Sequence, residues 1–347
     1  MTLLYLSPNM AEYAWASYQQ DVMDELARQA AVSFYGPGFP GYRPDQTLQQ
    51  VIGRMPEPPS CVIVGHAWLN DNPAKPLDAH PRFGLARSPA PVVMILNKEY
   101  VRLDEKLSWA REIGASGVFS HHHDAPGWSD IVGSACEFWP FAADHRKFFA
   151  LGDPREIDLF FSGILQNAPV GQSDLRVRIM ASLFHCEGDL PLRKRDEFAE
   201  LNLFFNALPR DPAEREAAER RGLYRRLSER EYAATMRKSR LVISTRSPAG
   251  LVSPRTFEAM FSGSLVLAEH NPVHRLILGE HAPAEFENER ECIDRALRLL
   301  SDPDTPRRAE LARLHALEHH TWAARIGAML DRVERQAGPI RRVAAAA

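Results

Sequence analysis

The sequence lacks most features that mark specialised protein classes. Its formal net charge is only −3 over 347 residues, so it has no excess of basic residues of the kind that nucleic-acid-binding domains carry. No apolar run approaches the ~20 residues that a membrane-spanning helix needs. The opening stretch MTLLYLSPN has no positively charged start, and its apolar run is short, which predicts a strand and not a signal peptide. We therefore expect neither a nucleic-acid partner nor a transmembrane segment.

Cysteine is also scarce. The chain has 4 cysteines, which are widely separated and form no C-x-x-C pair. This pattern is typical of reduced, buried cysteines in a cytoplasmic protein. Hydrophobic residues make up 45% of the chain and charged residues 25%, as in ordinary globular proteins.

The first half of the chain alternates short apolar runs with amphipathic stretches. The runs show little polar alternation, which predicts strands that are covered on both faces, as in a parallel sheet. Strand candidates lie at 2–6, 31–38, 61–69, 91–100 and 116–123. A helix is predicted at 11–29 and another just before the last strand, with Asp104 as its N-cap and Gly114 at its end. This order indicates a doubly wound α/β domain.

The same rhythm restarts after residues 136–158, a segment with prolines and clustered aromatics that we interpret as a crossing between domains. Strands are predicted at 158–165, 240–245 and 264–269, and helices at 173–184, 287–302 and 305–336. The charge-rich stretch 186–228 shows only two helical pieces around Gly222. We predict an α/β protein of two Rossmann-like domains, 1–145 and 155–320, facing across a cleft. Residues 321–340 form a final helix that packs back toward the first domain.

One motif stands out in the second half, SPRTFEAMFSGSLVLAE at 253–269. It predicts a helix that follows a strand, and the free N–H groups at the start of such a helix suit an anion. Arg255 can form a fork onto phosphate oxygens, and Glu258 can accept hydrogen bonds from two adjacent hydroxyls, as on a ribose. Gly263 allows a tight turn into the next strand. The alternative is an ion pair between Arg255 and Glu258 on the helix surface.

This motif resembles the nucleotide-sugar motif of glycosyltransferases with the GT-B fold, E-A-x-x-x-G-x-x-V. The variant R-T-F-E-A is similar to that of the spore-maturation-protein-like branch. Three further segments support the resemblance, which covers about residues 155 to 335: DLFFSG, the sequence LVIS preceded by Tyr232 and Ser239, and HTW-x-x-R in the final helices.

The resemblance implies a donor site. Glu258 would hold the ribose, while Arg255 and the helix start, with Ser253 and Thr256, would hold the diphosphate. Gly163 would let the phosphates approach, and Arg246 and Gly250 would border the base or sugar. Gly250 stands where many retaining members have a second glutamate, which favours an inverting reaction.

An inverting transfer needs a base from the acceptor-binding domain. Four residues follow predicted strands there, namely His66, His122, Asp124 and Glu12. We favour His122 or Asp124 because the stretch SHHHDAPGW concentrates titratable groups. That stretch also allows a zinc site or a plain polar loop, but neighbours on a strand point to opposite faces, so three consecutive histidines rarely reach one ion.

The sequence thus predicts a cytoplasmic glycosyltransferase that moves a sugar from a nucleoside diphosphate-sugar to an unidentified glycan, lipid-linked or protein acceptor, as in bacterial polysaccharide biosynthesis. We expect no metal and no cofactor. Two alternatives stay open, a nucleotide-sugar epimerase of the same fold and a noncatalytic nucleotide-binding module. The basic stretch RRGLYRR at 220–226 is typical of a solvated surface, with peripheral contact to an anionic membrane as the alternative.

Overall fold

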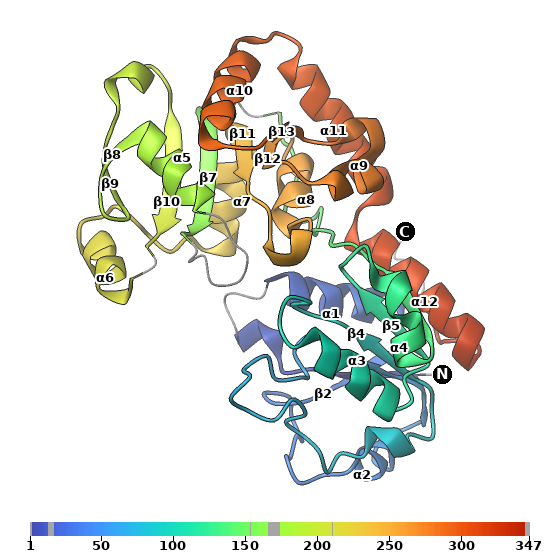
Figure 1. Ribbon diagram of the computed structural model, residues 1–347. Helices are drawn as coiled ribbons and strands as arrows, with labels where there is room; N and C mark the ends of the chain where they lie inside the picture. The colour runs from blue at the N-terminus through green and yellow to red at the C-terminus, as the bar shows by residue number, and fades with distance from the viewer. Residues whose placement is uncertain (1, 13–16, 153, 166–173, 210, 344–347) are drawn as a thin grey trace. The chain divides into compact units, whose positions relative to one another are not determined.

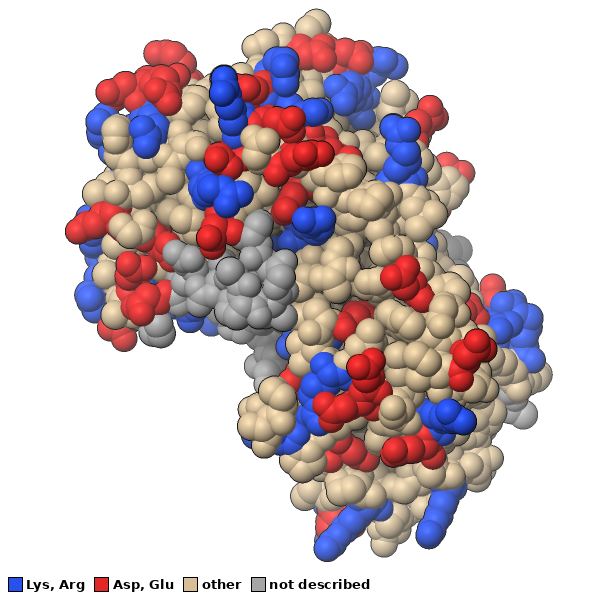
Figure 2. Space-filling model, viewed as in Figure 1, with Lys and Arg blue, Asp and Glu red and all other residues tan. Residues whose placement is uncertain are grey.

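The computed structural model describes residues 2–12, 17–152, 154–165, 174–209 and 211–343. The chain forms two compact units, one of Met1–Phe141 with Trp322–Ala347 and one of Ala142–Thr321. None of the described helices combines the length and the apolar character that crossing a bilayer requires. Figure 2 shows acidic and basic side chains interspersed over the face in view, in keeping with the small net charge.

The first unit is built on a six-stranded parallel sheet (Figure 1). Its strands are buried runs, and Leu3 to Leu6 in the first of them are at most 1% exposed. The order across the sheet is β2-β1-β3-β4-β5-β6. The strands are β1 (Thr2–Leu6), β2 (Val32–Tyr35), β3 (Pro59–Val64), β4 (Val92–Ile95), β5 (Gly117–Ser120) and β6 (Ala135–Phe138).

Helices of the first unit pack on this sheet. One core joins the side chains of Leu4 and Leu6 with apolar residues of α2, α3 and α4. Helices α1 and α12 pack against each other, and the Gln29 side chain donates to the Ala323 carbonyl, 2.8 Å away. The helices are η1 (Met10–Glu12), α1 (Ser17–Gln29), α2 (Leu48–Ile52), η2 (Leu85–Arg87), α3 (Leu103–Glu112), η3 (Ala125–Trp128), α4 (Ser129–Val132) and α12 (Trp322–Ala337).

The second unit has a five-stranded parallel sheet with the order β10-β7-β11-β12-β13. Two further strands form an antiparallel hairpin that lies between β7 and β10 in the sequence. The sheet strands are β7 (Ile157–Ile164), β10 (Leu203–Leu208), β11 (Ser239–Ser244), β12 (Leu265–Glu269) and β13 (Ala284–Phe286), and the hairpin strands are β8 (Phe184–Glu187) and β9 (Leu190–Lys194).

Helices of the second unit begin at well-formed caps. Ser228 and Glu231 form a capping box at the start of α7, and Asn288 caps α10. Helices α5 and α10 pack together, while α8 packs against α7 and α11. The helices are α5 (Leu175–Leu183), η4 (Asp196–Phe198), α6 (Pro212–Arg220), α7 (Glu229–Arg237), η5 (Pro248–Gly250), α8 (Pro254–Phe261), α9 (Pro272–Leu278), η6 (Gly279–His281), α10 (Glu289–Ser301) and α11 (Thr305–His319).

The predicted alternation of buried strands and helices is confirmed, but several strands were missed. β6 lies inside the segment interpreted as a crossing, and β10 and the hairpin lie in the charge-rich stretch. The single helix predicted at 305–336 is two helices: α11 ends at His319, and α12 begins at Trp322. The helix predicted at 173–184 is α5, which begins at Leu175, and the predicted first residue, Ser173, lies outside the described residues.

The start of α3 also corrects the prediction. The helix begins at Leu103, so its N-cap is Arg102, with a left-handed φ of 55°, and Asp104 lies within the first turn. Arg102 is held there because its guanidinium donates to three carbonyls of the preceding loop, including that of Lys75 at 2.8 Å.

Gly65, directly after β3, is a position where the fold excludes a side chain. A Cβ atom there would lie 2.5 Å from the Tyr5 ring, which is only 1% exposed. Since the ring cannot move into solvent, we expect Gly65→Ala to lower the free energy of unfolding of the first unit by about 1–3 kcal/mol. All 6 tryptophans belong to this unit, so urea denaturation followed by tryptophan fluorescence measures the effect.

Gly127→Ala is the matched control, because a Cβ atom at Gly127 would meet nothing within 4 Å. Equal denaturation midpoints for Gly65→Ala and the wild type would contradict the packing described here.

Candidate functional site

The start of α8 is organised by local sequence. Ser253 is the N-cap, and its hydroxyl accepts the Arg255 N–H at 3.2 Å. Pro254 fits the first helical position, where no N–H is needed. Thr256 and Phe257 anchor the helix, since both are 0% exposed. The Thr256 hydroxyl is buried, and it has no hydrogen-bond partner among the described residues.

Arg255 reaches from α8 to the end of β7. Its Nη2 donates to the Ser162 carbonyl at 2.6 Å, and its guanidinium lies 5.3 Å from the centre of the Phe161 ring. A Cβ atom on Gly163 would lie 2.9 Å from Nη2. The glycine therefore leaves room for the arginine, where the sequence had suggested room for phosphates alone.

Arg255 and Glu258 do not form the ion pair that was the alternative interpretation. Tyr232 of α7 lies between them, donating its hydroxyl to Glu258 Oε2 at 3.0 Å and lying 3.4 Å from Arg255 Nε. Burial raises the pKa of Glu258, although the Arg255 charge and the Tyr232 hydrogen bond act the other way. A buried carboxylate with one hydrogen-bonded oxygen can stabilise its charge by accepting further hydrogen bonds.

A second arginine, Arg176, completes this basic cluster and was not predicted. It lies in the first turn of α5, where Nη1 donates to the Ile164 carbonyl at 2.7 Å and Nε donates to the Thr245 hydroxyl. Burial, together with the nearby Arg255 charge, lowers the pKa of Arg176 to about 9. Two guanidiniums thus flank Phe161 at the carboxyl end of β7, and within the described residues neither pairs with a carboxylate.

The loop between β11 and α8 is fixed from the end of β12. The Arg246 N–H donates to Glu269 at 2.8 Å, and the Arg246 guanidinium lies 3.6 Å from the same carboxylate. Gly250 has a φ of +71°, and its carbonyl accepts from the Asn271 side chain at 2.7 Å. Arg246 and Gly250 therefore both lie in the loop between β11 and α8, but the Arg246 guanidinium and N–H already interact with Glu269.

In the first unit, His66 forms a buried pair with His121. Their Nε2 atoms are 3.0 Å apart, and His121 Nδ1 lies 2.8 Å from the Trp139 carbonyl. A carbonyl only accepts, so His121 Nδ1 carries the proton and its Nε2 accepts from His66. His66 Nδ1 is then a bare acceptor, and it is buried without a partner. Burial lowers the pKa of both imidazoles, that of His66 well below the ordinary value.

Glu99, which was not predicted, adjoins this pair. Its Oε1 accepts from the Ser120 hydroxyl at 2.6 Å and from the His121 N–H at 2.8 Å, while Oε2 is buried without a partner. Both His66 and Glu99 follow strands of the parallel sheet, so they lie at its carboxyl edge. Glu99 could have been suspected from sequence as a carboxylate after the buried run VVMIL.

The loop after β5 holds the remaining predicted residues. β5 ends at Ser120, so the histidines occupy a bend, where His122 and His123 stack with ring centres 4.7 Å apart. Together with Asp124 they bring ligand atoms within 4.8 Å of one another, as a metal site would need, while His121 turns away into the core. Asp124 is 65% exposed, and its N–H donates to His122 Nδ1. Glu12 ends the short helix η1 after β1.

Comparison with known proteins adds a family model and several folds. Residues 220–331 match the model described as glycosyl transferase-like. No curated protein sequence matches the chain. The Anabaena HepE protein, solved in complex with UDP and glucose, has a TM-score of 0.60 at 12% identity, covering 96% of this chain and 100% of its own.

Two further solved structures are similar over nearly the whole chain. Sucrose-phosphate synthase from Thermosynechococcus elongatus has a TM-score of 0.56 at 12% identity and covers 97% of this chain and 98% of its own. A DNA-modifying β-glucosyltransferase has a TM-score of 0.57 at 13% identity and covers 98% and 100%. The expected pair of parallel-sheet domains is confirmed as the fold, whereas no comparison separates out a spore-maturation branch.

The His66 pair predicts a pH dependence of stability. Because burial holds the folded pKa below the unfolded value of about 6.5, the unfolded chain binds the extra proton, and stability is lost as the pH falls below ~6.5. At pH 5.5 one such group lowers the free energy of unfolding by up to about 1.4 kcal/mol. His66→Gln should therefore flatten the decline in unfolding free energy between pH 7.5 and 5.5, measured by tryptophan fluorescence.

His123→Gln, which changes a histidine of the same unit whose side chain is 35% exposed, should keep the wild-type slope. If His66→Gln also keeps that slope, His66 is not held neutral in the folded protein.

Proposed function

We infer that the protein is a glycosyltransferase, because the chain has the GT-B fold and its residues 220–331 match the glycosyl transferase-like model. We propose that it moves a sugar from a nucleoside diphosphate-sugar to an acceptor hydroxyl. The observation that carries this proposal is the pair Arg176 and Arg255 at the carboxyl end of β7, beside the N-terminus of α8 and without a carboxylate partner in the described chain. Such a site suits a diphosphate.

The neighbouring carboxylate suits the rest of a nucleotide. Glu258 Oε2 accepts from Tyr232, and ribose hydroxyls are the donors that would further stabilise the ionised form of Glu258. Ser253 contributes the helix cap, and Gly163 the space for Arg255. Arg246 and Gly250 are proposed to border the base or sugar. UDP-glucose is the donor to try first, since the similar HepE structure contains UDP and glucose.

The acceptor oxygen is proposed to attack the anomeric carbon as its proton passes to a base of the first unit. The bond from the anomeric carbon to the phosphate oxygen breaks, and the nucleoside diphosphate leaves, stabilised by Arg176 and Arg255. Gly250 offers no carboxylate to the sugar, which supports inversion. His66 offers a bare Nδ1, whereas His122 Nδ1 already accepts an N–H, so we now place His66 ahead of His122, Asp124 and Glu12.

We propose that no metal takes part in donor binding, because guanidiniums take the place of a cation at the proposed diphosphate site. The His122, His123 and Asp124 group is the feature that would argue otherwise. A cytoplasmic location is proposed from the four free cysteines and the use of a nucleotide-sugar. In the stretch 220–226, Arg220, Arg221 and Arg225 each pair with a glutamate, which weakens the case for membrane contact.

Incubation with UDP-glucose separates the three functional hypotheses. UDP release that depends on an added acceptor, or slow hydrolysis without one, supports a transferase. An isomerised nucleotide-sugar formed without acceptor would indicate an epimerase, and tight binding without turnover of any donor would indicate a noncatalytic module.

The donor site predicts the effect of removing its charges. Arg176→Gln and Glu258→Gln should each weaken UDP binding by about 1.5–3 kcal/mol, the usual loss for a hydrogen bond to a charged group. Arg178→Gln is the matched control, since Arg178 lies on the same helix but pairs with Glu289. Calorimetric titration with UDP measures the three affinities, and an Arg176→Gln affinity equal to that of Arg178→Gln would refute the site.

The base is tested by single alanine substitutions at His66, His122, Asp124 and Glu12. One of them should lower turnover by roughly 10²–10⁴ with UDP affinity unchanged, as expected for loss of a general base. Near wild-type turnover in all four variants, or a product with the donor's anomeric configuration by NMR, would contradict base-assisted inversion.

A further inference from the structure

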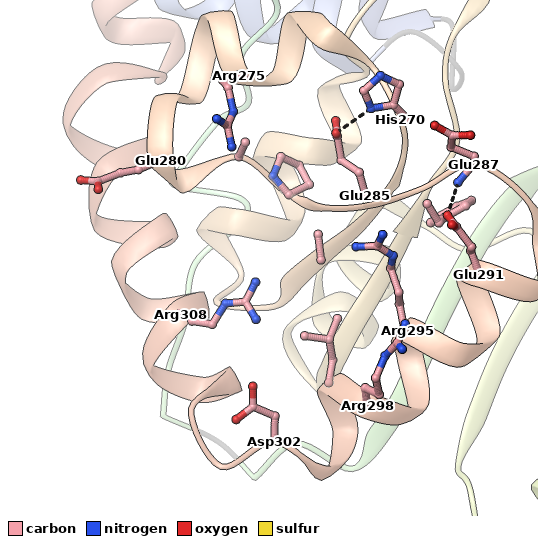
Figure 3. Close-up of a pocket in the computed structure, with 15 residues that line it drawn as sticks. His270, Arg275, Glu280, Glu285, Glu287, Glu291, Arg295, Arg298, Asp302 and Arg308 are labelled. Carbon is pink, nitrogen blue, oxygen red and sulfur yellow. Dashed lines mark hydrogen bonds and ion pairs between the residues drawn. The ribbon is translucent and has the colours of Figure 1, made fainter.

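A second candidate site, lined by four arginines and five acidic residues, lies at the edge of the sheet in the second unit. A pocket of about 770 Å³ runs along β13 and is walled by that strand, by α10 and α11, and by the segment from α9 to η6 (Figure 3). β13 is the outermost strand, so one side of its backbone has no strand partner in the sheet. None of the residues of the proposed donor site lines this pocket.

Four arginines line it, Arg275, Arg295, Arg298 and Arg308. In Figure 3, Arg308 from α11 and Arg295 from α10 extend toward each other, and Arg275 reaches in from α9. Among the described residues, none of the four side chains forms an ion pair or a hydrogen bond. The Nε atom of Arg295 is buried without a partner. By contrast, Arg313, also on α11, pairs with Glu310 at 2.7 Å.

Four of the five acidic residues that line the pocket, all but Glu287, have other partners or point away from it. Glu285 lies 2.8 Å from His270 Nδ1 and 2.7 Å from His274 Nδ1, so both of its oxygens are engaged. Glu291 accepts the Glu287 N–H at 2.9 Å. Asp302 accepts the Asp304 N–H at 2.9 Å, and Glu280 points away from the pocket in Figure 3. None of the four guanidiniums is therefore paired directly with these carboxylates.

We propose that this pocket binds a soluble small molecule with more than one phosphate group, at a site separate from the sugar donor. Guanidinium forks match phosphate oxygens in pairs, and a pocket of this volume accepts a whole metabolite. The arginines come from three helices, so a ligand with more than one phosphate group can engage several of them at once.

The pocket adjoins the donor site through β12. His270, in the pocket wall, directly follows Glu269, whose carboxylate holds the Arg246 N–H of the β11–α8 loop. A ligand that moves His270 would also move the neighbouring Glu269 at the end of β12, and with it the loop that Glu269 holds. The pocket is thus suited to a regulatory ligand.

Calorimetric titration of the full chain with inorganic pyrophosphate at low salt tests the proposal. The wild type should show two binding events, one in each site. The double variant Arg295→Gln/Arg308→Gln should lose one event or weaken it at least about tenfold, and Arg255→Gln should weaken the other. Arg313→Gln, on the same helix α11 but outside the pocket, should keep both.

The outcomes separate this proposal from the proposed function. A single event that the double variant keeps and Arg255→Gln weakens would overturn the second site and leave the donor site standing. A single event that Arg255→Gln keeps and the double variant weakens would support the pocket and count against the donor site. No binding event would count against both sites. If circular dichroism shows that the double variant does not fold, Arg298→Gln takes its place, because Arg298 is exposed. It should weaken the same binding event by the same factor.

Discussion

The hydrogen bond from Arg255 to the Ser162 carbonyl is the contact around which the candidate site is arranged. It ties the start of α8 to the end of β7, and the absence of a side chain at Gly163 leaves room for it. The same guanidinium lies over Phe161 and approaches the Tyr232 hydroxyl, which in turn donates to Glu258. One arginine thus contacts a strand end, a helix start and the partner of a carboxylate, while its own charge has no carboxylate partner among the described residues.

The lack of a partner for this charge is energetically unfavourable. A guanidinium that is half buried is normally paired, because its charge is poorly solvated. Arg176 shows the consequence, since burial and the Arg255 charge together lower its pKa. Two like charges held close by carbonyl hydrogen bonds are stabilised by an anion between them. The arrangement therefore favours the bound state over the free one, as in other preorganised electrostatic sites.

Local pattern was sufficient to predict the sheets, but not everything in them. Apolar runs such as LLYL and VVMIL identify strands buried on both faces. By contrast, β13 has only three residues, and the run LFFNAL of β10 was missed because it lies within a charge-rich stretch. The motif around Arg255 and Glu258 was predictable because its residues are close in sequence. Arg176 was not, since Arg176 and Arg178 look alike in SDLRVR and only tertiary contacts distinguish them. His66 was found as a strand-end residue, but its pairing with His121 depends on strands that end earlier than predicted.

Each unit holds polar groups at its candidate site that a substrate of the proposed reaction would satisfy. In the second unit, the guanidiniums of Arg176 and Arg255 have no carboxylate partner among the described residues, and phosphate oxygens are acceptors that match them. In the first unit, His66 Nδ1 and Glu99 Oε2 are buried acceptors without a partner, and hydroxyls are donors that match them. Buried polar groups without partners are costly, so the first set favours a ligand such as a diphosphate and the second a ligand with a hydroxyl. This chemical argument for the proposed reaction does not depend on likeness to any other protein.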